Sequence, residues 1–146
     1  MSRIRKTFIL FCLLFSAALA ADTVDPTYQF RGVHFIASYC DCDRKALTDL
    51  EKLVDAMKDA VNKSGATVLE VSRWTFPPNG LTMVFLLSES HASIHTYPEH
   101  GACFVDLFTC GERCSSEQFD IALREYLKPT AVHVRTLVRN QEIQEK

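Results

Sequence analysis

Hydrophobic and polar positions alternate in several short runs of the chain, and this pattern predicts β-strands. Residues 33–39 and 132–138 place apolar and polar side chains in turn, as a strand with one buried face does. Residues 66–76 and 81–87 are rich in β-branched and aromatic or aliphatic side chains, and a Pro-Pro-Asn-Gly turn at 77–80 separates them. These last two runs are expected to form a hairpin.

A second period, close to 3.6 residues, indicates helices. Between 44 and 63 the apolar residues recur at helical spacing, and Gly65 follows as a left-handed stop. Ser115 opens a capping box at the start of another helix, which Pro129 ends. With a further apolar strand at 102–109, the order is strand, helix, three strands, helix, strand. It predicts an α+β two-layer sandwich, with a mainly antiparallel sheet and two helices packed on one face.

The N-terminus has the pattern of a targeting segment. Three basic residues within the first six positions precede an apolar run from 8 to 19 and a small-residue exit. This run is shorter than the roughly 20 residues that span a bilayer. Residues 1–21 are therefore expected to be a signal-peptide-like leader, with residues 22–139 as the domain and 140–146 as a polar tail. An exported or periplasmic protein without stable membrane association is expected; a cytoplasmic location is the alternative.

Composition narrows the class of protein. The chain has 146 residues, 47% of them hydrophobic, which suits one globular domain. Its formal charge of -2 becomes -5 once the three basic residues of the leader are removed, and no dense basic patch lies elsewhere. Nucleic acid is therefore not an expected partner.

The cysteines allow several arrangements. Cys12 lies in the leader, and the odd number that remains leaves at least one thiol free. Their spacing does not give the connectivity of Cys40, Cys42, Cys103 and Cys114. The gaps between them do not match the usual zinc pattern, so no metal site is predicted.

The densest chemistry lies in residues 88–99 and at the thiol of Cys110. Hydroxyls, imidazoles and carboxylates gather there at the ends of apolar strands. A small sheet can hold such groups rigidly, and this arrangement is typical of a catalytic site.

From Gly32 to about Arg139 the sequence resembles the small prokaryotic-type S-adenosylmethionine decarboxylases, pyruvoyl enzymes that make their own cofactor by self-cleavage. The matching motifs are Glu89-Ser90-His91, Ile94-His95-Thr96, Pro98-Glu99 and Asp106-Leu107-Phe108-Thr109-Cys110-Gly111, in the family's order and at its spacing. The resemblance implies that the Ser90 hydroxyl attacks the Glu89 carbonyl and that the backbone breaks between these two residues. Ser90 then becomes the pyruvoyl cofactor, which forms a Schiff base with the amine of a small-molecule substrate.

The resemblance also implies roles for other residues. His95 matches the base of self-processing, Thr82 stands where a serine that assists processing is expected, and Cys110 matches the proton donor of decarboxylation. Glu99 is assigned to the substrate ribose, and Phe76 with Tyr97 to stacking around the adenine. A homodimer of processed two-chain protomers is expected, with active sites that draw on both protomers.

The expected activity is decarboxylation of S-adenosylmethionine to the aminopropyl donor for spermidine biosynthesis. Two alternatives stay open. Met83, Tyr97 and Ser38 depart from the family pattern around the pocket, which keeps a pyruvoyl-dependent arginine or ornithine decarboxylase in view. Thr82, Met83 and the additional cysteines keep open an exported, unprocessed homologue without catalysis.

Overall fold

The computed structural model describes residues 31–110 and 113–139. The expected leader and polar tail lie outside these residues. Six strands form one antiparallel sheet in the order β2-β3-β4-β5-β1-β6. The strands are β1 (Gly32–Cys40), β2 (Val68–Phe76), β3 (Gly80–Leu87), β4 (Ser90–Tyr97), β5 (Ala102–Thr109) and β6 (Ala131–Arg139).

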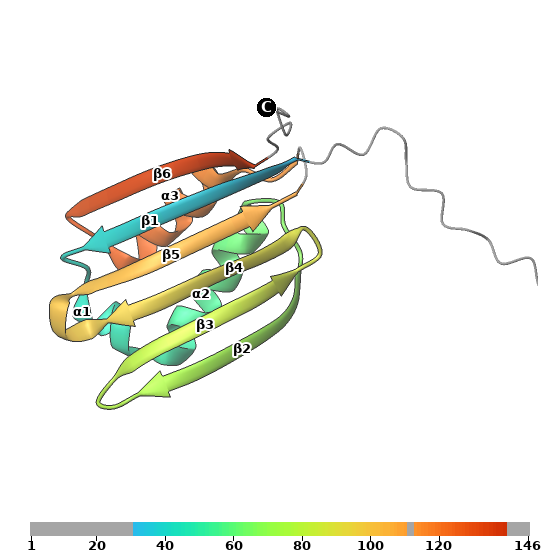
Figure 1. Cartoon of the computed structure of the whole chain (residues 1–146). Helices are drawn as coiled ribbons and strands as arrows, with labels where there is room; N and C mark the ends of the chain where they lie inside the picture. The colour runs from blue at the N-terminus through green and yellow to red at the C-terminus, as the bar shows by residue number, and fades with distance from the viewer. Residues whose placement is uncertain (1–30, 111–112, 140–146) are drawn as a thin grey trace, which may run out of the picture.

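The helices all lie behind the sheet in the view of Figure 1. They are α1 (Arg44–Thr48), α2 (Leu50–Lys63) and α3 (Ser116–Leu127), and a short 3-10 turn, η1 (Pro98–His100), joins β4 to β5. Helices on one face and an open second face make an α+β sandwich, as the sequence predicts. Among the described residues, the helices are too short and too polar to cross a membrane.

Alternation along each strand builds the core between sheet and helices. Phe35, Tyr39, Phe85 and Ile94 point to this side and are buried, together with Phe119 of α3. The Tyr39 hydroxyl donates a hydrogen bond of 2.5 Å to Asp120 on α3. We call this side of the sheet the covered face; this chain's own helices complete it.

Two expectations about the elements need correction. The helix expected over 44–63 is two helices, because Asp49 ends α1 and its side chain caps α2 by accepting a bond from the backbone of Lys52. Residues 90–97, for which no strand was predicted, form β4 at the centre of the sheet. Ala92, Ile94 and Thr96 face the core there, a set with one large aliphatic side chain, so the apolar signal of this strand is weak.

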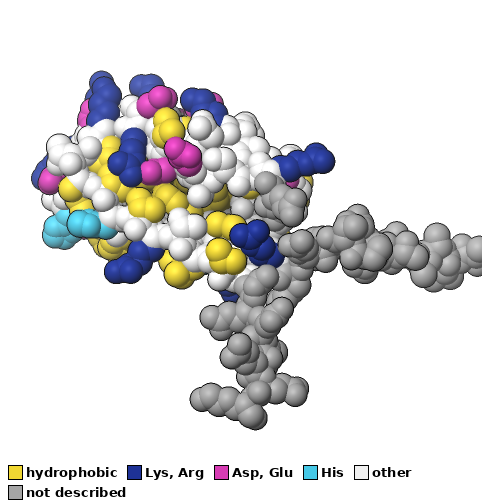
Figure 2. All heavy atoms as spheres, turned by 90° about the horizontal axis from the view of Figure 1, so that it is seen from above, with side chains coloured by type: hydrophobic (Ala, Val, Ile, Leu, Met, Phe, Trp, Pro, Cys, Tyr) yellow, Lys and Arg dark blue, Asp and Glu magenta, His cyan; other side chains and the backbone are white. Residues whose placement is uncertain are grey.

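The other side of the sheet, which we call the open face, carries large apolar side chains that solvent reaches. By the strand register, its exposed members are Ile36, Trp74, Phe76, Val84, Leu86, Phe104 and Leu137. Figure 2 shows hydrophobic side chains among charged ones on the side of the molecule where β6 lies. Exposed apolar patches of this kind are typical of interaction surfaces rather than of surfaces that stay in contact with solvent.

Candidate active site

Ser90 stands at the start of β4, immediately after the turn that leaves β3. Its backbone φ is +146°, a conformation that residues with a side chain rarely adopt. Such a backbone stores about 1–3 kcal/mol of strain, and strained residues gather at functional sites. The Ser90 hydroxyl lies 3.1 Å from Nδ1 of His91.

Backbone hydrogen bonds fix Glu89, the residue before Ser90. Its carbonyl oxygen accepts a bond of 2.8 Å from the N–H of Cys110, and its carboxylate accepts one of 2.8 Å from the N–H of Thr67. Burial raises the pKa of the Glu89 carboxyl, but hydrogen bonds from Ser88 and from backbone N–H groups outweigh burial and lower it. The carboxylate is therefore ionised at neutral pH, and hydrogen bonds hold both the main-chain carbonyl and the side chain of Glu89.

Cys110 follows the last residue of β5 and brings its half-buried thiol to the same end of the sheet. A Cβ added to Gly32 would lie 3.6 Å from the Cys110 sulfur and would collide with the ring of Phe108. A glycine at this position thus makes room for the aromatic ring and the thiol. We call Glu89, Ser90 and Cys110 the cleavage end of the open face.

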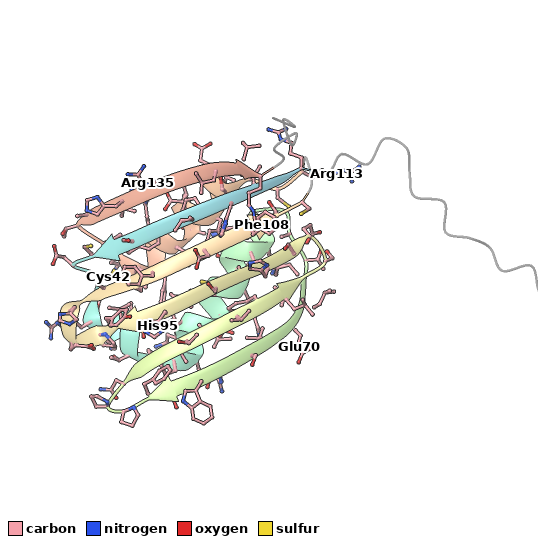
Figure 3. All side chains as sticks on the ribbon, viewed as in Figure 1. Cys42, Glu70, His95, Phe108, Arg113 and Arg135 are labelled. Carbon is pink, nitrogen blue, oxygen red and sulfur yellow. The ribbon has the colours of Figure 1, made fainter. Side chains whose placement is uncertain are left out.

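A second group of predicted residues lies farther along β3 and β4. Thr82 and His95 are opposite each other in the register, and Thr82 Oγ1 is hydrogen-bonded to His95 Nδ1 at 2.5 Å. The ring centroids of Phe76 and Tyr97 lie 5.8 Å and 4.6 Å from that of His95. Figure 3 shows His95 and Phe108 on the side of the sheet toward the viewer, away from the helices.

Glu99 lies in η1, two residues beyond Tyr97, with an exposed side chain. Its carbonyl oxygen accepts a bond of 3.3 Å from the guanidinium of Arg44 at the start of α1. We call Thr82, His95, Phe76, Tyr97 and Glu99 the base end of the open face.

The two ends do not meet within one chain. Ser90 and His95 are five residues apart on the extended strand β4, which corresponds to roughly 16 Å. His95 therefore cannot reach the Ser90 hydroxyl of its own protomer. The structure brings the predicted residues together as two groups rather than one.

A polar group near the cleavage end was not singled out from the sequence. Nε2 of His34 is buried without a hydrogen-bond partner among the described residues, 3.7 Å from a carboxylate oxygen of Asp106. The other oxygen of Asp106 accepts a bond of 2.9 Å from the Ser93 hydroxyl. The His34 ring lies 5.4 Å from that of Phe108. The pairing of β1 with β5 brings His34 to Asp106 and Phe108, and the pairing of β4 with β5 brings Ser93 to Asp106; the sequence pattern is silent about both.

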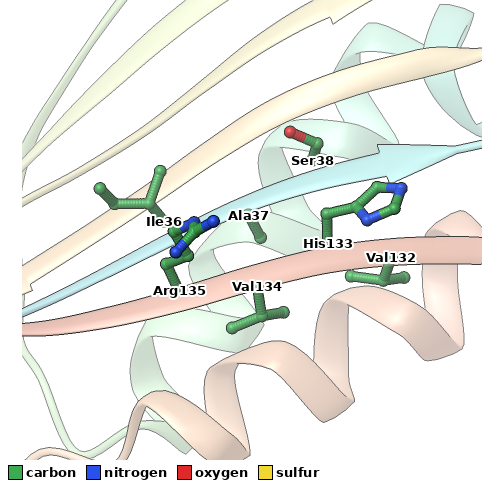
Figure 4. Close-up of a pocket in the computed structure, with 7 residues that line it drawn as sticks. All are labelled: Ile36, Ala37, Ser38, Val132, His133, Val134 and Arg135. Atoms are coloured by element: carbon green, nitrogen blue, oxygen red, sulfur yellow. The ribbon is translucent and has the colours of Figure 1, made fainter.

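A shallow hollow lies elsewhere, along the edge formed by β1 and β6 (Figure 4). Its lining residues are Ile36, Ala37, Ser38, Val132, His133, Val134 and Arg135. None of the predicted catalytic or substrate-binding residues lines it.

A family model described as S-adenosylmethionine decarboxylase matches residues 33–140. The chain belongs to the S-adenosylmethionine decarboxylase family. Apart from Gly32, the first residue of β1, the match covers every strand and helix of the described fold and both ends of the open face. The family resemblance and the class of enzyme that the sequence predicts, a carboxy-lyase, are confirmed.

Individual members of the family agree with this assignment. The chain is similar to the S-adenosylmethionine decarboxylase proenzyme of Thermosipho africanus, with 44% identity over 70% of this chain and 79% of the relative. The proenzyme of Methanococcus aeolicus is 38% identical over 77% of this chain and 97% of its own length. The crystal structure of the adenosylmethionine decarboxylase from Aquifex aeolicus matches with a TM-score of 0.70 and 30% identity, over 79% of this chain and 95% of that one.

Proposed function

We propose that this chain is a self-processing S-adenosylmethionine decarboxylase that cuts itself between Glu89 and Ser90. The observation that carries this proposal is the geometry of that peptide bond. Ser90 combines a strained backbone with a hydroxyl, and the Glu89 carbonyl receives the N–H of Cys110 at 2.8 Å. The description of its relatives as proenzymes supports a precursor that is processed.

The cleavage proceeds in three balanced steps. The Ser90 oxygen bonds to the Glu89 carbonyl carbon as the carbon–nitrogen bond breaks, so an ester replaces the amide and the nitrogen takes a proton. A base then removes the Cα proton of residue 90. The bond between the Ser90 oxygen and its Cβ breaks, and Glu89 leaves with a new main-chain carboxylate. Water adds to the remaining imine and ammonia departs, which leaves a pyruvoyl group at residue 90. The Cys110 N–H stabilises the negative charge on the carbonyl oxygen in the first step.

The pyruvoyl group supplies a carbonyl that condenses with the substrate amine and accepts the electron pair released with carbon dioxide. The residues around Ser90 fit this group, because the Cys110 backbone and thiol lie at the same end of the sheet. The Cys110 sulfur holds the proton that replaces the lost carboxylate, because its half-buried thiol lies at the same end of the sheet as residue 90.

At the base end, His95 takes the protons of the cleavage reaction, and the Thr82 hydroxyl holds its ring by the bond of 2.5 Å. Phe76 and Tyr97 flank this imidazole and offer aromatic faces to a purine. The Glu99 carboxylate lies next to them and accepts from ribose hydroxyls. These residues favour S-adenosylmethionine over arginine or ornithine, which have no ring to stack. The product is then the aminopropyl donor for spermidine biosynthesis.

A homodimer across the open face joins the two ends. The exposed apolar residues of that face need a cover, and a second copy of the same face provides a self-complementary one. A two-fold axis through the middle of the face brings the cleavage end of one protomer to the base end of its partner. This pairing removes the separation of roughly 16 Å between Ser90 and the base.

Mixing two inactive variants tests this arrangement. Ser90→Ala lacks the nucleophile and stays uncut, whereas His95→Ala lacks the base and is cut only slowly on its own. In an equal co-expressed mixture, a dimer of one of each has one complete site, so about half of the His95→Ala chains should be cut at the wild-type rate if pairing is random. Mass spectrometry tells the chains apart. Cleavage in the mixture that is no faster than in His95→Ala alone, with a wild-type sample that cuts, would show that the site lies within one chain.

Substrate choice is tested separately with the processed protein. Release of carbon dioxide from S-adenosylmethionine, arginine and ornithine is compared, with borohydride as a trap for the carbonyl. We expect turnover of S-adenosylmethionine that borohydride abolishes. Turnover of an amino acid alone would favour the alternative decarboxylase, and an intact chain with no turnover would favour the non-catalytic homologue.

A further inference from the structure

We propose that Cys42 and Cys103 form a disulfide bond, and that this bond ties together the two chains produced by cleavage before Ser90. The second half of this inference rests on the proposed function, and the first half does not. The five cysteines of the described residues are all thiols in this structure.

The backbone brings Cys42, just after β1, close to Cys103 at the start of β5. Tyr39 of β1 is the register partner of Cys103 in β5. The chain then turns at Asp41, whose φ is +53°, and the N–H of Cys42 donates a bond of 2.7 Å to the Gly101 carbonyl. Cys42 is thus fixed two residues from Cys103 across the strands. In Figure 3, Cys42 lies at the end of the sheet where β1 leads to the helices.

The two thiols share the covered side of the sheet. Cys42 is 6% exposed and Cys103 is fully buried. The pKa of the Cys42 thiol is lowered chiefly by a hydrogen bond from the Cys103 thiol, and that bond together with burial raises the pKa of Cys103. Because Cys42 keeps some exposure while Cys103 has none, Cys42 is the sulfur that a small disulfide reaches first, and Cys103 is the resolving thiol.

The other cysteines lie in different surroundings. Cys40 follows Tyr39 in β1, so its side chain faces the open side rather than the core. Cys114 has its pKa raised by burial, and its thiol is hydrogen-bonded to Thr109 near Glu89. Cys110 lies at the cleavage end, where the proposed chemistry needs it reduced. A disulfide between the buried Cys42 and Cys103 leaves the Cys110 thiol reduced.

The bond forms by exchange with a small-molecule disulfide such as oxidised glutathione. The Cys42 thiolate attacks one glutathione sulfur, which gives a mixed disulfide and releases one glutathione thiolate. Cys103 loses its proton, attacks the Cys42 sulfur and displaces the second glutathione. Two protein thiols are oxidised, one small disulfide is reduced to two thiols, and the protons go to these products. The expected leader would direct the chain to a compartment where such oxidation persists.

Cys42 and Cys103 lie on opposite sides of the cleavage site, so a disulfide between them would link the two products. Cys42 belongs to the N-terminal product, which contains β1, β2 and β3, and Cys103 belongs to the C-terminal product, which contains β4, β5 and β6. Strand β1 of the first product lies between β5 and β6 of the second. Without a disulfide, only packing and hydrogen bonds hold these interleaved chains. With it, the cut protomer stays covalently whole.

Peptide mapping of the wild-type protein is the direct experiment. The full chain is incubated with oxidised glutathione, free thiols are blocked, and the protein is digested before aspartates without a reductant. Asp41, Asp43 and Asp106 separate Cys40, Cys42 and Cys103 onto different peptides. We expect the peptide that ends at Val105 to carry the dipeptide Asp41-Cys42, two hydrogen masses lighter than the separate thiols. Blocked thiols at both positions, or a bond from Cys103 to Cys40, would overturn the inference.

Denaturing gels show the consequence for the two chains. Oxidised, processed wild-type protein should run as one band without a reductant and as two bands with it. Cys103→Ala should give two bands under both conditions, whereas the matched control Cys40→Ala should behave as the wild type. If the two chains of Cys40→Ala run apart without a reductant, the assignment to Cys42 and Cys103 is refuted. This result does not depend on whether the Cys103 variant folds.

The two proposals fail in different ways. A single chain of full mass after reduction would contradict cleavage before Ser90, while the linked peptide would still establish the disulfide. Two chains after reduction with both thiols blocked would leave the cleavage intact and reject the disulfide.

Discussion

The covered face and the open face are built from the same six strands, and they differ in what completes them. On the covered face, side chains such as Phe85 and Ile94 are fully buried by this chain's own helices. On the open face, Trp74 is 70% exposed and Phe104 is 52% exposed, among groups capable of acid–base chemistry. The comparison teaches that this chain's own helices complete one face of the sheet, whereas the chemistry that we propose for the other face requires a second copy.

Substitutions on the two faces should therefore have separable effects. A change on the covered face should alter the free energy of unfolding and leave the cleavage chemistry of the folded molecules unchanged. A change in the open-face residues that we assign to cleavage or to the apolar contact should alter cleavage or assembly at nearly constant stability, whereas other polar residues of that face should tolerate substitution.

The largest effect is expected for Ser90→Ala on the open face. Without the hydroxyl no ester can form, so the chain should stay continuous and carbonyl-free. Ser72→Ala, which removes an exposed hydroxyl from β2, is the matched control and should be cut like the wild type. Intact mass after prolonged incubation checks both variants. A Ser90→Ala sample that still splits at residue 90 would contradict the cleavage mechanism.

His95→Ala is expected to slow cleavage without abolishing it. A positioned base contributes about 10²- to 10⁴-fold to a proton-transfer step, so the rate should fall within this range. His133→Ala, which changes an exposed histidine of β6, should keep the wild-type rate. The rate is followed by the decay of the full-length mass. Equal rates for the two variants would remove His95 from the processing reaction.

Leu86→Lys tests whether the open face is the dimer interface. Leu86 is 50% exposed, and a lysine there would place a charge in the proposed contact of both protomers. Truncating a central contact costs about 2 kcal/mol, so dimerisation should weaken by at least ~30-fold, and cleavage should fall with it. Ile121→Lys on α3, where the side chain is 44% exposed, is the control that should stay dimeric. Sedimentation at several concentrations separates these outcomes.

Sequence patterns predicted the covered face better than the open one, for a physical reason. Apolar alternation and helix caps report burial against a chain's own helices, so the α+β sandwich was predicted correctly. Strand β4 was missed, because its core-facing residues are mostly small or polar and its outward residues serve chemistry. The break at Asp49 was missed, because one helical stripe continues across it.

The candidate site shows the same division. The motif spacing named Ser90 and His95 but could not show that they lie on one strand, about 16 Å apart. Pairing between β1 and β5, which joins distant segments, was needed to find His34 beside Asp106. It was also needed to place Cys42 against Cys103. The sequence therefore predicted candidate chemical groups, and only the sheet shows which of them lie together.

The smallest effect is expected on the covered face, for Tyr39→Phe. This change removes the hydrogen bond to Asp120 and should lower the free energy of unfolding by about 1–2 kcal/mol. Cleavage by the folded variant should match the wild type. Chemical denaturation near pH 8 measures the loss, and a slower cleavage at equal folded fraction would show that the two faces are not independent.

The pH dependence of the same variant sharpens this last test. Burial first, and the bond to Asp120 second, raise the pKa of the folded Tyr39 phenol far above its ordinary value of 10.0. The unfolded phenol releases its proton above that value while the folded one keeps it, so wild-type stability falls as pH rises past 10. Tyr39→Phe lacks this contribution. The stability difference between the two proteins should therefore shrink above pH 10, by up to ~1.4 kcal/mol per pH unit, and a constant difference up to pH 11 would show that solvent reaches the phenol.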